Sequence, residues 1–154
     1  MKDWLCPILA ARNNAPSPGR LIMLTISEEK MSGEFTKQHL KGLPFGAVIH
    51  HFTAQDTGSP HDHPFSFTSH ILSGGYIEKV FHVDEDGKWT SEWIDRKPGT
   101  VHTVEATHIH QITDLPEGEC YTLIIPKEKV REPRFWKFDE NGSQSRAWYE
   151  GDYE

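Results

Sequence analysis

Short apolar or alternating segments separated by turn sequences dominate the chain from Phe45 to Pro126. Each segment is long enough for one strand and too short for a typical helix. Predicted strands cover residues 47–52, 61–72, 76–83, 89–94, 100–104, 109–112 and 121–125. Turn sequences separate several of them: Gly74-Gly75, Asp84 to Gly87, Pro98-Gly99 and Leu115 to Gly118. This pattern is typical of an all-β sandwich or barrel.

The two ends of the chain have weaker patterns. Residues 1–18 are predicted to form an irregular or short helical lead, and residues 21–26 a buried strand. Residues 27–40 are polar with sparse apolar positions, so we expect a short helix or an ordered loop there. In the tail, Trp136 and Phe138 are expected to pack on the barrel. No repeat or domain boundary is visible, so a single domain over residues 1–154 is predicted.

Composition and charge narrow the function classes. The chain has 23 acidic and 16 basic residues and a net charge of −7, which disfavours binding to nucleic acid. The basic cluster over residues 127–134 is interrupted by acids and is interpreted as a solvated loop. No signal sequence or membrane-length apolar run is present, so a cytoplasmic protein without membrane contact is predicted. Cys6 and Cys120 form no CxxC pattern and are expected to be reduced thiols.

The histidines suggest the chemistry. Nine of the ten lie between His50 and His110, the part predicted to form strands. His61 and His63 are two positions apart, so on an extended chain both imidazoles point to the same face. Such a pair can bind one metal ion, and imidazole accepts zinc, iron, nickel and copper alike.

Two segments resemble the motifs of the cupin superfamily. The first cupin motif is G-x5-H-x-H-x(3,4)-E-x6-G, and His61 and His63 match its histidine pair, with Gly74 or Gly75 as its last glycine. The second is G-x5-P-x-G-x2-H-x3-N. Starting it at Gly99 places His110 at the ligand position, whereas Glu105, Thr107 and Asp114 replace the Pro, Gly and Asn.

The resemblance covers roughly residues 45–126. It implies a double-stranded β-helix, the cupin or jelly-roll barrel, with short N-terminal and C-terminal extensions and assembly as a homodimer. The string from His61 to Glu78 and the segments after it are also similar to small single-domain cupin-like proteins of bacteria and phages. Tyr76 and Glu78, which follow the Gly-Gly turn, are candidates for a general base or proton relay, or are ordinary strand residues.

The resemblance implies a divalent metal ion, Fe, Zn, Ni or Mn, bound by His61, His63 and His110. The carboxylate position of the first motif is Phe67 or Thr68, so a ligand set without a carboxylate is expected. His102 and His108 remain alternatives to His110, and His70 is a candidate fourth ligand.

This three-histidine set resembles that of some cupin dioxygenases. We therefore expect a mononuclear, metal-dependent, dioxygenase-like enzyme that acts on a small molecule. The alternative is a non-catalytic ligand-binding or structural cupin whose metal is structural or absent.

Overall fold

The computed structural model describes residues 23–153, and over this range the protein is built almost wholly of antiparallel strands. One sheet has six strands, in the spatial order β1 (Thr25–Lys30), β2 (Phe35–Lys41), β3 (Ala47–Phe52), β9 (Cys120–Pro126), β4 (Phe67–Ser73) and β7 (Val101–Val104). A second sheet has the order β6 (Trp89–Arg96), β5 (Tyr76–Val83) and β8 (Ile109–Asp114). β10 (Arg134–Asp139) and β11 (Gly142–Ala147) form a hairpin, followed by a single 3-10 turn, η1 (Trp148–Glu150).

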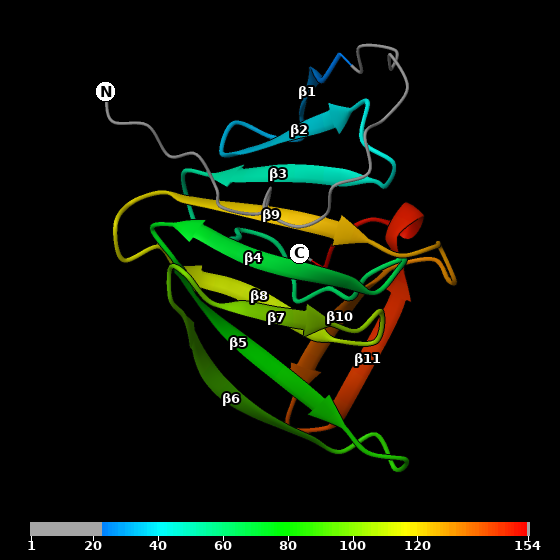
Figure 1. Ribbon diagram of the computed structural model, residues 1–154. Helices are drawn as coiled ribbons and strands as arrows, with labels where there is room; N and C mark the ends of the chain where they lie inside the picture. Colours follow the sequence, from blue (N-terminus) through cyan, green and yellow to red (C-terminus); the bar gives the residue numbers. More distant parts are fainter. Residues whose placement is uncertain (1–22, 154) are drawn as a thin grey trace.

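A single residue connects the hairpin to the second sheet. His61 makes an isolated antiparallel bridge to His110 of β8 and another to Phe135 of β10. The segment around His61 therefore lies between β8 and β10 and continues the sheet into the hairpin. In Figure 1 strands β1, β2, β3, β9 and β4 cross the upper part of the molecule, β5 and β6 lie below them, and the hairpin is on the right.

The core lies between the two sheets. Along β4, Phe67, Ser69 and Ile71 are buried, whereas the residues between them are more exposed, which is the alternation of a strand with one face inward. One buried cluster contains Ile71, Tyr76, Ile112, Leu115 and Cys120, and another contains Phe67, Val104 and Ile124. Since the first cluster draws on both sheets, the predicted all-β barrel is confirmed.

The predicted Gly-Gly turn joins β4 to β5. Gly74 has a φ of +77°, a conformation that side-chain-bearing residues rarely adopt. A Cβ at Gly74 would also overlap the backbone carbonyl of Glu119. Both constraints require glycine, so this turn fixes where β5 and its buried side chains begin.

Residues 27–40 are not a helix or a loop, and this prediction was wrong. They contribute to the β1–β2 hairpin, whose strands pair from Thr25 with Lys41 to Lys30 with Thr36. The Ser32 hydroxyl accepts hydrogen bonds from the backbone N–H groups of Glu34 and Phe35, both at 3.1 Å, and stabilises the turn. Both faces of β1 are largely exposed, so the alternation that reveals a strand is missing.

The strand predicted over residues 61–72 is also shorter than expected. After the bridge at His61 the chain is irregular as far as Ser66, and β4 begins at Phe67. The break follows from a change of sheet, because His61 pairs in the second sheet and β4 in the first. Pro64, which has no backbone N–H to donate, lies in the crossing segment.

Predictions for the two ends have different outcomes. Trp136 and Phe138 do pack on the barrel, and the ring of Phe138 stacks on Phe81 at 4.2 Å, but they belong to a hairpin that was not predicted. Cys120 is a buried free thiol. The predicted lead over residues 1–18, Cys6 and the first two residues of the strand predicted over 21–26 lie outside the described residues. The rest of that strand was predicted to be buried, and this was wrong: Met23, Leu24 and Ile26 are exposed, because β1 is the edge strand of its sheet.

The buried ring of His50 should make the stability of the protein depend on pH. Its ring packs edge-on against Phe35 and Phe52, and burial, followed by the charges of Lys37 and His39, lowers the pKa of His50 to about 3. Below pH 6.5 the unfolded chain therefore takes up a proton that the folded protein excludes, and this contribution to stability is lost progressively until about pH 3.

We expect His50→Gln to retain about 2–3 kcal/mol of unfolding free energy that the native protein loses between pH 7 and pH 4.5. Urea unfolding of both proteins at the two pH values measures this difference. An equal loss in the two proteins would contradict the assignment.

Candidate metal centre in the barrel

Three histidines far apart in sequence meet at one point. One ring nitrogen from each of His61, His63 and His110 lies within 4.8 Å of the others. Their ring centroids are 5.0–5.4 Å apart, and each pair of rings meets edge to face. Edge-to-face contact alone is ordinary packing for such rings, so the short separation of the three nitrogens is what indicates a shared ion.

Backbone pairing explains this convergence. His61 and His110 exchange two N–H···O=C hydrogen bonds, of 2.9 and 3.0 Å, so their side chains are direct cross-strand neighbours on one face. His63 lies two residues further along and donates its backbone N–H to the carbonyl of Ala106 at 3.0 Å. The strand register therefore holds the cluster, and no loop has to close over it.

Asp62 points the other way and anchors the His-x-His segment from behind. Its carboxylate is only 2% exposed and accepts hydrogen bonds from the backbone N–H of Arg134, at 2.7 Å, and from Nε1 of Trp136, at 3.0 Å. Arg131 completes the site with an ion pair of 3.0 Å. The residue between the two histidines thus attaches the C-terminal hairpin to them.

Glu78 orients His110. The carboxylate lies on the inward face of β5, is 1% exposed, and accepts a hydrogen bond of 2.5 Å from Nδ1 of His110. Because Nδ1 carries the proton, Nε2 of His110 keeps its lone pair and is free to bind a cation. His108, at 3.3 Å, and Nε of Arg96, at 2.5 Å, also donate to Glu78.

The protonation states suit a metal site. Burial alone would raise the pKa of Glu78, but the hydrogen bonds from His108 and His110, with the charges of His110 and Arg96, lower it far below its usual range. Burial, then the charge of His110, lowers the pKa of His61 to about 4 and that of His63 well below 6.5. Both rings are therefore neutral near pH 7, the form that binds metals.

One atom in particular is left without a partner. Nε2 of His63 is buried and makes no hydrogen bond to any residue in the range 23–153. An unpaired buried imidazole nitrogen costs about 1–3 kcal/mol, a cost that a bound cation or water would remove. The donor set therefore fits a divalent ion that accepts nitrogen ligands.

A second cluster shares His110 but suits a cation less well. Glu78, His108 and His110 also bring one potential ligand atom each within 4.8 Å. However, Glu78 is already paired with Arg96, and a cation there would meet the guanidinium charge. It would also displace the proton by which His110 bonds to Glu78. The first cluster is therefore the better candidate for a metal position.

The other predicted candidates lie elsewhere. His70 does not reach the cluster: it alternates with the buried residues Ser69 and Ile71 of β4, so its side chain faces the outside of the barrel. His102, on β7, has two buried ring nitrogens without partners in the described range but belongs to neither cluster. Phe67, at the expected carboxylate position, packs edge-on against His63 at 5.1 Å.

The motifs did not identify Glu78 as the orienting group. The sequence offers Glu78 as a general base, a proton relay or an ordinary strand residue, and nothing in it points to Arg96. The sequence does contain a signal for it, because every second residue of β5, Tyr76, Glu78 and Val80, points into the barrel. A buried acid at such a position needs hydrogen-bond or charge partners.

Comparison with known proteins supplies the fold. No family model and no curated protein sequence matches the chain. Among solved structures it is similar to hydroxypropylphosphonic acid epoxidase from S. wedmorenis, with a TM-score of 0.50 and 12% identity over 66% of this chain and 55% of that one. The comparison with a crystal structure of FeII HppE gives a TM-score of 0.50 and 13% identity, over 75% of this chain and 64% of that one. The comparison with an oxalate decarboxylase structure gives a TM-score of 0.50 and 14% identity, over 72% of this chain and 31% of that one.

The chain has the cupin fold. The resemblance drawn from the two motifs is thus confirmed for the fold, and the chain spans about a third to two thirds of the length of those structures. The narrower likeness to bacterial and phage proteins stays a prediction. No helix within residues 23–153 is long and apolar enough to cross a membrane.

Proposed function

We propose that this cupin binds one divalent metal ion through His61, His63 and His110 and acts on a small molecule as a mononuclear, dioxygenase-like enzyme. The observation that carries the proposal is the meeting of three imidazole nitrogens within 4.8 Å, with Glu78 holding His110 in the right tautomer. Iron is the first candidate, since the FeII HppE structure shares the fold, followed by manganese, zinc and nickel.

The charges of the site support this reaction class. His61 and His63 are neutral, and Glu78 is balanced by Arg96, so these groups do not cancel the charge of a divalent ion. When bound, the ion would supply Lewis-acid and, for iron, redox chemistry. Three protein ligands leave positions open, and anionic or chelating substrates are favoured there.

His102 is the residue that we assign to the substrate. It lies on the inward face of β7, as the burial of Val104 two residues later shows, and no described residue pairs with either ring nitrogen. Burial, then the charge of Arg96, lowers the pKa of His102 to about 4, so the ring is neutral. A neutral ring offers one donor and one acceptor to a polar group of the substrate.

Metal loading tests the proposal. Untagged protein, freed of metal with a chelator, is titrated anaerobically with Fe(II) and separately with Mn(II), Zn(II) and Ni(II). We expect about one tightly bound ion per chain and a rise in melting temperature on binding. His70→Ala should bind identically. Binding well below one ion per chain for all four metals would overturn the proposal, and metal binding without turnover of any small molecule would indicate the non-catalytic alternative.

Glu78→Gln should weaken metal binding by about 10–100-fold, the usual cost of losing a partner that orients a ligand. The glutamine can still accept one hydrogen bond, but it loses the charge that holds the proton on Nδ1 of His110 and balances Arg96. Competition with a chromophoric chelator measures the affinity. A change in affinity below about threefold would show that Glu78 does not orient His110.

We further propose that the chain forms a single domain and that two copies of it assemble as a homodimer in the cytoplasm. Leu72 and Val101, on the neighbouring strands β4 and β7, are 50% and 56% exposed, and this apolar surface supports self-association. Light scattering in solution gives the mass of the particle.

A further inference from the structure

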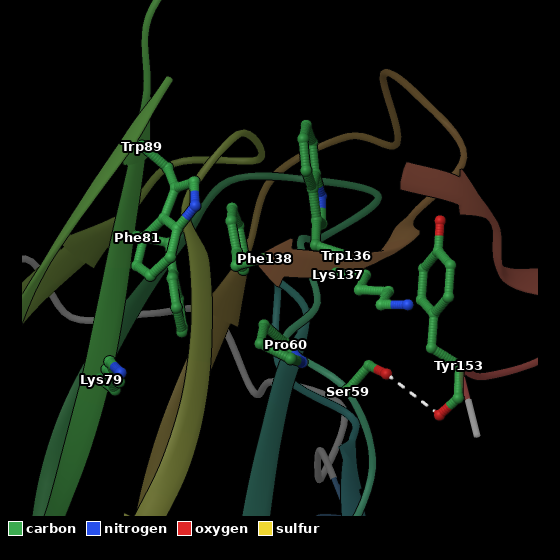
Figure 2. Close-up of a pocket in the computed structure, with 9 residues that line it drawn as sticks. All are labelled: Ser59, Pro60, Lys79, Phe81, Trp89, Trp136, Lys137, Phe138 and Tyr153. Atoms are coloured by element: carbon green, nitrogen blue, oxygen red, sulfur yellow. Dashed lines mark hydrogen bonds between the residues drawn. The ribbon is translucent and has the colours of Figure 1, made fainter. Parts of the chain in front are cut away.

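A hollow of about 340 Å³ lies on the outer face of the second sheet (Figure 2). Lys79 and Phe81 of β5 line it, and they alternate with Glu78 and Val80, which face the barrel interior. The hollow and the histidine cluster are therefore on opposite faces of one sheet. Its volume is at the lower end of the range for small-molecule sites.

Aromatic rings form its walls. The ring of Phe138 lies parallel to that of Phe81, at 4.2 Å, and to that of Trp136, at 6.0 Å, with interplanar angles of 4° and 6°. Trp89 is tilted beside Phe138 at 5.3 Å. Figure 2 shows these four side chains in one row, with Tyr153 beyond Trp136.

Hydrogen bonds hold the two indoles in place. Nε1 of Trp89 donates to the carbonyl of Asp139 at 2.9 Å, and Nε1 of Trp136 donates to Asp62 at 3.0 Å. Both polar groups are therefore used within the protein, and the face of Trp136 that is not stacked on Phe138 remains for a ligand. Fixed aromatic faces bind planar rings by stacking at low entropic cost.

The charge of the lining is opposite to that of the chain. Lys79 and Lys137 line the hollow together with Ser59, and none of the described residues in its lining is acidic, although the net charge is −7. For the hydroxyls of a neutral sugar the lining offers no carboxylate or amide acceptor, only the hydroxyls of Ser59 and Tyr153. An adjoining hollow of about 500 Å³ includes Asp62, but Arg131 already pairs with that carboxylate.

We propose that this hollow binds a small planar ring that carries an anionic group, the chemistry shared by nucleoside monophosphates and aromatic carboxylates. The ring stacks on the face of Trp136 that is turned away from Phe138, and the anionic group pairs with the ammonium group of Lys137, which lies between Trp136 and Tyr153 in Figure 2. Its binding does not depend on the metal centre, which lies across the sheet.

Quenching of tryptophan fluorescence in metal-free protein tests the site. The probes are adenosine monophosphate and benzoate, with adenosine and inorganic phosphate as controls. We expect saturable quenching by at least one of the two anions, with adenosine binding about tenfold more weakly and phosphate alone giving no quenching. Saturation by only one of the two anions also supports the proposal and shows whether the ligand is a nucleotide or an aromatic carboxylate.

Two variants and a matched control locate the binding. Lys137→Met and Tyr153→Ala should each weaken the binding by about tenfold, because one removes the charge and the other a wall. The side chain of Tyr149 is 71% exposed and lies outside the lining, so Tyr149→Ala should bind the anion as the native protein does. The proposal is overturned if neither anion saturates, if adenosine binds as tightly as its monophosphate, or if Tyr149→Ala loses as much affinity as Tyr153→Ala. None of these outcomes bears on metal loading.

Discussion

His63→Ala should reduce the affinity for the metal ion by more than about 100-fold, beyond the usual loss of an orienting partner. The variant removes a neutral, buried nitrogen that makes no hydrogen bond within the described residues, so its loss should cost little stability while taking away one of three ligands. His61→Ala and His110→Ala should lose comparable affinity, although His110→Ala also leaves Glu78 without one of its two closest partners. Competition titration with a chelator measures each affinity.

The controls distinguish the candidate third ligands. His70→Ala, on the outer face, and His102→Ala, which belongs to neither cluster, should keep affinity within about threefold. Circular dichroism verifies that each variant is folded. If His102→Ala abolished binding and His110→Ala did not, the ion would lie on the β7 side of the barrel and the ligand assignment would be wrong.

Much of the barrel followed from local pattern. Residues 76–83 alternate and end in turn residues, and β5 has those bounds; residues 47–52 match β3. The strands that were not predicted lack a clear division into one apolar and one polar face. β1 is exposed on both faces, and β11 (GSQSRA) has no large apolar residue, so neither contains the period of two that marks a half-buried strand.

The site could be predicted only as far as short-range spacing reaches. His61 and His63 are neighbours on one face of any extended segment, but their closeness to His110 depends on a backbone pairing between residues 49 positions apart in the chain, which only a family motif could suggest. Glu78 and Arg96 pair through the register of β5 with β6, and no spacing rule encodes that register. Asp62 shows the same limit, because its partners come from the unpredicted hairpin.

Asp62→Ala should destabilise the protein by about 3–5 kcal/mol, the range for removing one partner of a buried ion pair. Its carboxylate is 2% exposed and satisfies three donors: the Arg134 backbone, the Trp136 indole and Arg131. Alanine would leave the first two without an acceptor and the guanidinium without its counterion. Urea unfolding at pH 7 measures the difference, and Glu85→Ala, an exposed acid in a turn, should change the free energy by less than about 0.5 kcal/mol.

Asp62→Asn separates the hydrogen bonds from the charge. The amide oxygen can still accept from the backbone of Arg134, so we expect a loss smaller than that of alanine, with the remainder due to the ion pair with Arg131. Because Asp62 holds the segment that carries His61 and His63, both variants should also bind the metal ion more weakly, in the order of their stabilities. If Asp62→Ala unfolded at the same urea concentration as the native protein, the hairpin would not be what positions the His-x-His pair, and the β8 backbone pairing alone would have to hold it.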